Sequence, residues 1–349
     1  MMTTETWPDL LNRLVAGENL SAAQTRWAMN QVMSGEATPS QIAALAVGLR
    51  AKGETAEEVV GMADGMLANA RTFDVPGPAV DIVGTGGDRS GSVNISTMSA
   101  IVTAAAGAPV VKHGNRSASS KCGAADVLEA LGVVAALEPE AVARCVTELG
   151  IGFCFAPVFH PALRFAGPTR RELGIPTIFN LLGPLTNPAR PNAGLVGCAY
   201  PDKLEVIANV FAARKASALV VRGDDGLDEL TTTTTSTVWR VAGENVTVHS
   251  FDPRDVGIDR AAAEDLRGGD AEQNAAVVRA LVAGETGPVR DAVLLNAGAA
   301  LAAFSGFGGS LVDDIAAGIE RAAEALDSGA AAQLLDRWVA LSQSLAGQD

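Results

Sequence analysis

The chain has 349 residues, of which 48% are hydrophobic and 19% charged, so it is long enough for two globular domains and too apolar for extended disorder. Lys and Arg total 26 against 40 Asp and Glu, and the net charge of −14 argues against nonspecific nucleic-acid binding, which needs a cationic surface. No apolar run reaches the ~20 residues of a membrane span, and the N-terminus lacks the basic start and apolar segment of a signal peptide. We therefore expect neither a nucleic-acid nor a membrane partner.

The first seventy residues carry three polar helix starts. Ser21 precedes a segment with helical periodicity, and Thr38-Pro39-Ser40-Gln41 forms a capping box with proline at the first helical position. Thr55 with Glu58 forms a second box before another apolar helical pattern. These signals predict a helical domain over residues 1–72.

The pattern changes after Pro76-Gly77-Pro78, a linker-like segment. Strands and helices then alternate, which is typical of a mostly parallel sheet covered on both faces. We expect an α/β fold, with the small helical domain followed by a larger domain over residues 73–349. The β-prone run Thr231–Thr235 is predicted to continue the sheet. The predicted units are strands at 79–83, 108–112, 193–198 and 218–222, and helices at 123–131 and 201–213.

A glycine turn, Gly84-Thr85-Gly86-Gly87-Asp88, follows the first predicted strand, and an apolar helix begins after Asn94. Glycines let the backbone approach a ligand closely, and a helix N-terminus favours an anion. The spacing matches neither a P-loop nor a Rossmann turn. From the turn alone, a tight strand–helix connection that binds nothing is an equally good interpretation.

The second predicted strand ends in a polar segment, residues 112–121. It holds three cations, Lys112, Arg116 and Lys121, together with an imidazole, an amide and several hydroxyls, and it has no acid. Ligands bind at the carboxyl ends of strands in open α/β sheets. This predicts a basic pocket for a small anion, against the alternative of a solvated loop.

Histidines and cysteines give weaker indications. His160 is placed near the chemistry, whereas His249 lies in a strand-like context and is predicted to be structural. The four cysteines show no CxxC spacing, so neither a zinc site nor a disulfide framework is indicated, and a cytoplasmic protein with reduced thiols is expected. They are Cys122, Cys145, Cys154 and Cys198.

Taken together, the motifs resemble those of the anthranilate phosphoribosyltransferases. The resemblance covers nearly the whole chain from the helical segment onward, in the family's order and approximate spacing. It departs at Gly167-Pro168-Thr169 and at 231–237, which lacks a Gly-Pro often found there; both affect loop shape. The motifs are GTGGD at 84–88, NxST at 94–97, KHGNRxxSS at 112–120, GAADVLEALG at 123–132, HPA at 160–162, RRELG at 170–174, TIFNLLGPLTNP at 177–188 and GLDE at 226–229.

The resemblance implies an enzyme of tryptophan biosynthesis that transfers 5-phosphoribose from phosphoribosyl pyrophosphate to the amine of anthranilate and releases pyrophosphate. It implies two Mg²⁺ ions per subunit, and magnesium suits this role because it binds phosphates through one or two carboxylates and waters. It also implies a homodimer through the N-terminal helices, and a helical domain completed by a segment near 165–186.

The same resemblance assigns the site residues. For Asp228 and Glu229 by themselves, an exposed acidic turn is the simpler interpretation, and only the family pattern makes them metal ligands. The implied phosphoribosyl pyrophosphate residues are Gly84, Gly87, Asp88, Asn94, Ser96, Thr97, Lys112, Ser119 and Ser120; the anthranilate residues are Gly84, His113, Asn115 and Arg170; the metal residues are Ser96, Asp228 and Glu229; and the catalytic residues are Lys112, Asp88 and His113.

Two other functions fit the general pattern. A pyrimidine nucleoside phosphorylase shares the architecture, but the glycine-serine loop of that family is not found in this chain. A nonenzymatic nucleic-acid-binding relative of the fold would need an extended basic surface, which an acidic chain does not provide.

Overall fold

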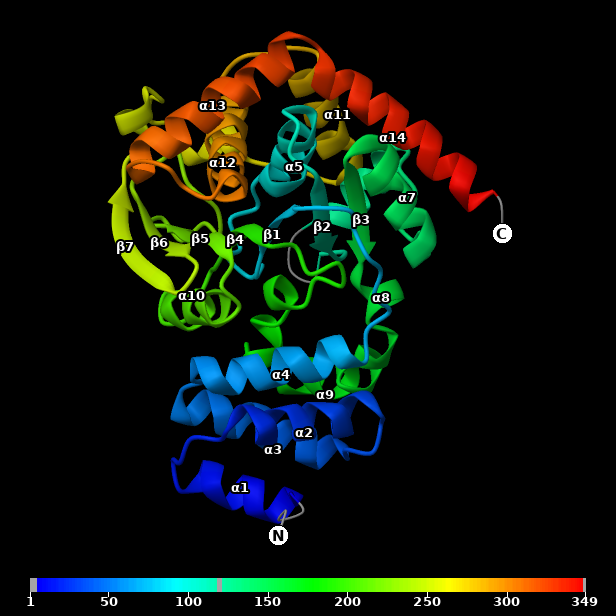
Figure 1. The fold of residues 1–349 in the computed structure, drawn as a ribbon, viewed down its shortest axis with the longest axis vertical. Helices are drawn as coiled ribbons and strands as arrows, with labels where there is room; N and C mark the ends of the chain where they lie inside the picture. The colour runs from blue at the N-terminus through cyan, green and yellow to red at the C-terminus, as the bar shows by residue number, and fades with distance from the viewer. Residues whose placement is uncertain (1–4, 118–120, 348–349) are drawn as a thin grey trace.

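The computed structural model describes residues 5–117 and 121–347. Its N-terminal part is a group of helices that lies below the rest of the molecule in Figure 1. Ser21, Thr38 and Thr55 cap the second, third and fourth of these helices, as predicted. The reciprocal capping boxes expected at Thr38 and Thr55 are present, and Ser21 forms one as well. The helices are α1 (Trp7–Val15), α2 (Ala22–Met33), α3 (Pro39–Lys52) and α4 (Ala56–Ala68).

Helices α2 and α4 pack together closely because glycine faces the contact. A Cβ atom on Gly61 would lie 2.0 Å from Thr25 Oγ1, so any larger residue there would push the two helices apart. Apolar side chains such as Met29 and Met62 fill the interior of this domain.

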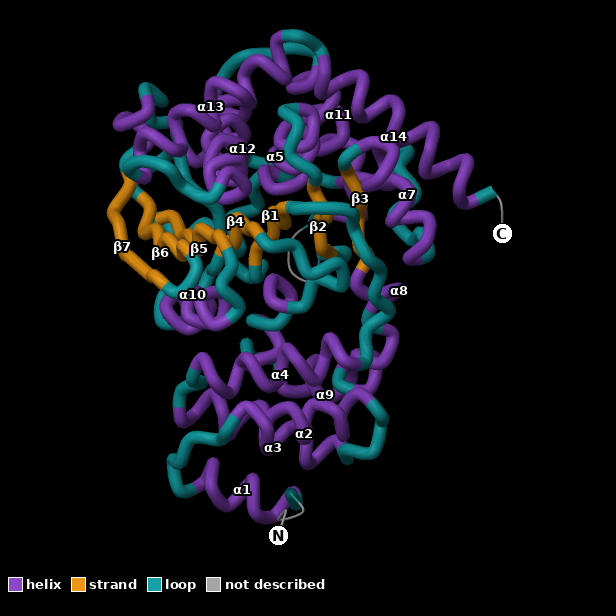
Figure 2. The backbone as a smooth tube through the Cα atoms, viewed as in Figure 1, coloured by secondary structure: helices purple, strands orange, loops and turns teal. Residues whose placement is uncertain are grey.

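A seven-stranded sheet forms the centre of the larger part, which confirms the α/β expectation (Figure 2). Its strand order is β3-β2-β1-β4-β5-β6-β7. Neighbouring strands among β1 to β5 are parallel, and β6 pairs antiparallel with both β5 and β7. The strands are β1 (Val80–Gly84), β2 (Val110–Gly114), β3 (Ile151–Phe155), β4 (Ala193–Gly197), β5 (Ser217–Gly223), β6 (Ser236–Ala242) and β7 (Asn245–Phe251).

Each face of the sheet has its own hydrophobic core, because successive side chains of a strand point to opposite faces. Ile82 belongs to the core beneath α5 (Ile95–Ala105), α12 (Pro288–Ser305) and α13 (Leu311–Asp327). Val83 belongs to the other core, which α10 (Leu204–Ala213) and the helical domain share. In Figure 1 these helices lie on the opposite side of the strands from α5 and α12. The helical domain is therefore packed on one face of the sheet.

After β3 the chain returns to the helical domain before it forms β4. In this excursion α9 packs against α3, and the short helix η1 packs against α2. No helix within the described ranges is both long and apolar enough to cross a membrane. The excursion contains α8 (Ala156–Phe159), η1 (Pro161–Phe165), α9 (Gly167–Leu173), η2 (Ile178–Asn180) and η3 (Gly183–Leu185); the remaining helices are α6 (Ala124–Leu131), α7 (Pro139–Leu149), η4 (Pro253–Val256), η5 (Ala263–Leu266), α11 (Ala271–Val282) and α14 (Ala330–Ala346).

The predicted strand at Thr231–Thr235 is wrong, since β6 begins only at Ser236. The threonine hydroxyls are drawn to acids of the preceding turn instead: Thr231 Oγ1 donates to Asp225 Oδ2 at 2.7 Å, and Thr235 donates to Asp224. Local side-chain hydrogen bonds thus override the β propensity of threonine.

Candidate active site

The glycine turn lies where the direction of the sheet connections reverses. From β1 the chain passes to β2 on one side, while β4 pairs with β1 on the other side. At such a switch point the connections leave the strand ends in opposite directions, and ligands bind in the crevice between them. The turn is joined to the neighbouring strand end by Thr85 N, which donates to Gly197 O at 2.9 Å.

Asp228 is packed directly against this turn. Its Oδ2 atom accepts a 2.8 Å hydrogen bond from Gly86 N. A Cβ atom on Gly84 would lie 2.3 Å from Asp228 Oδ2, and one on Gly197 would lie 1.6 Å from the Asp228 carbonyl oxygen. Glycine is therefore required at both strand ends for the acidic pair to approach the turn.

Lys112 lies near the acidic pair, whose charges act on it. Its side chain is buried, and Nζ donates to the Ile82 carbonyl oxygen and, at 3.1 Å, to Ser96 Oγ. Burial lowers the pKa of Lys112, and the negative charges of Asp81 and Glu229 oppose that shift. An ammonium group is thus held at the strand end against its own desolvation.

The pKa values of the acidic pair, Asp228 and Glu229, are also shifted by burial, but upward. Burial, followed by the nearby charge of Asp88, raises the pKa of Asp228 to about 7. Burial, followed by the charge of Asp228, raises the pKa of Glu229 well above its usual range. Crowded, desolvated carboxylates of this kind favour a cation between them. Within the described residues, no group of three or more His, Cys, Asp or Glu side chains could hold a metal; magnesium bound together with phosphate oxygens needs only one or two carboxylates.

Other predicted donor-binding residues have mixed surroundings. Asn94 is tied into the fold, since its Oδ1 accepts a 2.8 Å bond from Asn274 Nδ2 and its own Nδ2 donates to Cys122 O at 3.3 Å. The buried Thr97 hydroxyl has no partner within the described part of the chain. Ser119 and Ser120 lie outside the described residues.

The predicted basic pocket at residues 112–121 is wrong for Arg116. Its guanidinium donates to Asp126 at 2.8 Å and to Glu129 at 2.7 Å, both on α6. The charge of Arg116 is therefore neutralised by two acids that lie outside residues 112–121. Asn115 is exposed, and its Oδ1 accepts a 2.7 Å bond from Arg116 N.

Two neutral, buried histidines lie beside the strand ends, His113 on β2 and His160 directly after α8. His113 Nδ1 bonds to Gly183 O and His160 Nε2 to Thr186 O, each at 2.8 Å, and the ring centroids are 5.3 Å apart. Because carbonyl oxygens only accept, these two nitrogens carry the protons. Burial lowers the pKa of His113 to about 3, with His160 contributing, and burial lowers the pKa of His160 to about 4. Within residues 5–117 and 121–347, His113 Nε2 and His160 Nδ1 have no partner, so both present lone pairs.

Arg170 is a cation without an ionic partner, as no carboxylate in the described ranges forms a salt bridge with it. Its guanidinium lies 5.5 Å from the centre of the Phe179 ring. Burial lowers its pKa, and Tyr200 opposes that shift. A half-buried guanidinium of this kind suits the carboxylate of a ligand.

Three further residues shape the crevice and were missed in the sequence. Asp81 accepts from His113 N at 3.1 Å and from Asn187 Nδ2 at 2.8 Å, which supports the backbone of the histidine. A Cβ on Gly87 would lie 2.8 Å from the Tyr200 hydroxyl. Tyr200 is the only tyrosine of the chain and follows a predicted strand, a position that could have identified it. Asn187 lies within the TIFNLLGPLTNP motif, which gave it no role.

Comparison with known proteins matches both parts of the chain. Residues 76–332 match the family described as glycosyl transferase family, a/b domain, and residues 8–70 its helical bundle domain. An anthranilate phosphoribosyltransferase of Rhodococcus jostii is 64% identical, with 98% of this chain and 94% of that protein covered. The chain belongs to the anthranilate phosphoribosyltransferase family. It is a glycosyltransferase of tryptophan biosynthesis that transfers phosphoribose to anthranilate.

Solved anthranilate phosphoribosyltransferases have the same fold. The crystal structure of the Thermus thermophilus enzyme superposes with a TM-score of 0.90 at 44% identity, covering 96% of this chain and 99% of that one. The Saccharomyces cerevisiae enzyme in complex with PRPP and Mg has a TM-score of 0.88 at 24% identity, covering 98% and 99%. Family membership also decides against the nucleoside phosphorylase and the nucleic-acid-binding alternatives.

Proposed function

We propose that the crevice at the carboxyl ends of β1 and β4 carries out the transfer. Phosphoribosyl pyrophosphate lies over the glycine turn, and anthranilate lies on the side of the two histidines. The observation that carries the proposal is convergence: Gly86, Lys112 and Asp228, from three distant parts of the chain, meet at one strand end through hydrogen bonds and opposite charge. Distant residues that meet in a crevice with perturbed pKa values are typical of an active site.

In the donor half, the role of the protein is to stabilise the leaving group. Scission of the bond at the anomeric carbon leads, and negative charge grows on pyrophosphate. The Lys112 ammonium acts on that charge in a desolvated site, where such groups are most effective. The amides of the glycine turn that Gly197 O and Asp228 do not already occupy act with it. Gly84, Gly87, Asn94 and Thr97, with Ser119 and Ser120, complete the proposed surroundings of the phosphoribosyl group.

Magnesium fits the acidic pair. Asp228 and Glu229, with the Ser96 hydroxyl, would hold it, and when bound the ion neutralises the charge of pyrophosphate. The raised pKa values of both carboxyls support a cation at this place. The yeast relative in complex with PRPP and Mg is consistent with this proposal. We propose two ions per subunit.

In the acceptor half, Arg170 pairs with the anthranilate carboxylate, and Asn115 borders the ring. The lone pairs of His113 and His160 suit an amine, whose N–H groups are donors. Neutral imidazoles would hold the amine without adding charge beside the forming ribosyl cation. Asp88 is proposed to take the proton that the amine loses after it has attacked.

We further propose the organisation in which this site works. Residues 1–72, with the segment near 165–186, move as one domain and residues 73–349 as the other, and the subunits form a homodimer through the N-terminal helices. Val15 of α1 has 88% of its surface exposed and Val47 of α3 40%, which provides apolar area for a helix–helix contact. The reaction is placed in the cytoplasm, consistent with the four free, buried cysteines.

The decisive assay follows the fluorescence of anthranilate as it is consumed by the purified protein. We expect consumption only when phosphoribosyl pyrophosphate and Mg²⁺ are both present, with pyrophosphate released in equal amount. Consumption without the donor, or no consumption with donor and Mg²⁺ together, would contradict the proposal. Chelation of Mg²⁺ by EDTA and its subsequent restoration provide the internal control.

A further inference from the structure

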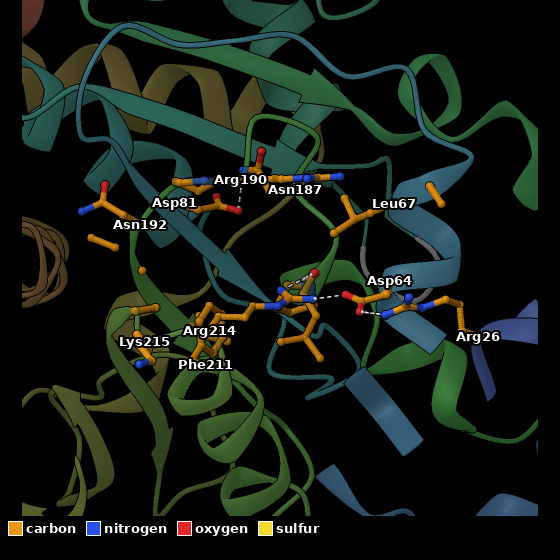
Figure 3. A pocket seen from close by; sticks show the side chains of 18 residues that line it. Arg26, Asp64, Leu67, Asp81, Asn187, Arg190, Asn192, Phe211, Arg214 and Lys215 are labelled. Atoms are coloured by element: carbon orange, nitrogen blue, oxygen red, sulfur yellow. Dashed lines mark hydrogen bonds and ion pairs between the residues drawn. The ribbon is translucent and has the colours of Figure 1, made fainter. Parts of the chain in front are cut away.

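A cavity of about 570 Å³ lies between the helical domain and the sheet (Figure 3). Leu67 and Ala68 of α4 form one wall, and Phe211 of α10 lies opposite. The floor is made by Ala193 and Gly194, at the amino end of β4. Its size is in the ~300–1,000 Å³ range of small-molecule sites, and both domains contribute to it.

The cavity carries an excess of positive charge. The lining has four cations and two acids in a chain whose net charge is −14, and one of the cations, Lys215, pairs with Glu244 outside the lining. Asp64 lies between Arg26 and Arg214, as Figure 3 shows, and forms an ion pair with each of them. The charged lining residues are Arg26, Arg190, Arg214, Lys215, Asp64 and Asp81.

Apart from Asn187 and Asn192, the uncharged lining is apolar or backbone-like. Leu67, Leu185, Val196 and Phe211 are buried core residues that also border the cavity. A ligand that fits both features has a compact apolar body and one anionic group. Guanidinium groups bind carboxylates through paired, charge-assisted hydrogen bonds, so a carboxylate is the anionic group that the cations favour.

Two of the cations are held by an uncommon backbone conformation. Arg190 has a φ of 50° and Lys215 a φ of 55°, in the left-handed region that non-glycine residues rarely adopt. No acid in the described ranges forms a salt bridge with Arg190, and it is exposed at the rim. The turn thus presents an uncompensated guanidinium at the entrance.

A short path joins the cavity to the acceptor half of the crevice. Asp81 and Asn187 line the cavity and are bonded to each other at 2.8 Å. The other carboxylate oxygen of Asp81 accepts from His113 N at 3.1 Å. A ligand that contacts Asp81 or Asn187 therefore acts on the backbone of His113 through the Asp81 side chain.

We propose that this cavity is an effector site for a small apolar carboxylate, aromatic or branched aliphatic. Such a ligand bridges α4 and α10, which fixes the helical domain against the sheet, and changes the affinity for anthranilate through Asp81 and His113. Binding at this site does not depend on the assignments in the crevice, so it can be measured separately from turnover.

The probe is 4-fluorobenzoate, and its binding to the full-length protein is followed by ligand-observed ¹⁹F NMR. We expect broadening with the unmodified chain, and affinity weaker by about tenfold in Arg190→Glu and in Arg214→Gln, since each removes a charge-assisted contact. Arg337→Glu, an exposed reversal on α14, is the matched control and should bind as the unmodified chain does. Circular dichroism checks the fold of each variant.

Arg170→Gln separates the cavity from the acceptor half of the crevice. Binding that survives in Arg170→Gln and weakens in Arg190→Glu supports the proposal. Binding that disappears in Arg170→Gln and persists in Arg190→Glu would place the probe in the crevice and overturn it, as would no binding at millimolar probe. The link to the crevice requires 4-fluorobenzoate to change the KM for anthranilate less in Arg190→Glu than in Arg337→Glu; equal effects would refute that link.

Discussion

The donor and acceptor halves of the crevice share the same strand ends but differ in their electrostatics. In the donor half, Asp228 and Glu229 are crowded beside Lys112, and burial opposes the charge of every group. In the acceptor half, His113 and His160 are neutral, and Arg170 is the cation. A polyanion with its metal needs charges that compensate one another, whereas an aromatic amine is selected by shape, by lone pairs and by one guanidinium.

The largest expected effect is in the donor half. The double variant Asp228→Asn, Glu229→Gln should require far more Mg²⁺ or lose activity altogether, because it leaves no carboxylate charge in the proposed metal site. Initial rates across a magnesium titration measure this. Asp224→Asn, an exposed acid of the same turn, is the control and should titrate as the unmodified chain does. A superimposable titration of the double variant would remove both acids from the metal site.

Lys112→Ala should have the next largest effect, also in the donor half. Removal of one preorganised charge that stabilises a transition state costs about 2.7–4 kcal/mol, or roughly 10²–10³ in rate. We expect this loss in kcat, measured at saturation with both substrates. A stability measurement on the variant is needed beside it, because Lys112 also bonds Ile82 O. Unchanged turnover would contradict the assigned role.

Arg170→Ala tests the acceptor half and should separate the two halves. A charge-assisted hydrogen bond contributes about 1.5–3 kcal/mol, so the KM for anthranilate should rise about tenfold or more while that for phosphoribosyl pyrophosphate changes little. The contrast with Lys112→Ala is the informative result. If both KM values rise together, the arginine supports the fold and the difference between the halves is lost.

The smallest expected effect concerns the neutrality of the acceptor half. Burial lowers the pKa of His160 to about 4, below its unfolded value of about 6.5. The unfolded chain therefore binds more protons between these values, and this stabilisation, present above about pH 6.5, is lost as the pH falls towards 4. At about pH 5 the free energy of unfolding should therefore be lower by roughly 2 kcal/mol on account of His160, at 1.36 kcal/mol per pH unit.

His160→Gln removes that term, so its free energy of unfolding should change less between about pH 7 and pH 5 than that of the unmodified chain. Urea unfolding at the two pH values measures the difference. Asp81, whose pKa burial raises to about 6, contributes with the opposite sign but equally in both proteins. Equal slopes would mean that folding does not lower the pKa of His160.

Local patterns predicted much of this protein because local chemistry controls the features concerned. The boxes at Thr38 and Thr55 form as expected, since a cap depends on residues three positions apart. The Gly84–Asp88 turn follows its strand as expected. Thr231–Thr235 was mistaken for a strand because β propensity does not include the competing carboxylates of Asp224 and Asp225.

The amino-acid sequence by itself determined the class of fold, the family and the places where strands end in reactive residues, because these depend on periodicity, glycine positions and motif order. Only the tertiary structure decided which charges remain uncompensated. Arg116 is paired with α6 whereas Arg170 has no acid partner within the described ranges, although both are arginines in a motif. Charge compensation and burial depend on elements far apart along the chain, and the cavity beneath β4 exists only because the helical domain packs on the sheet.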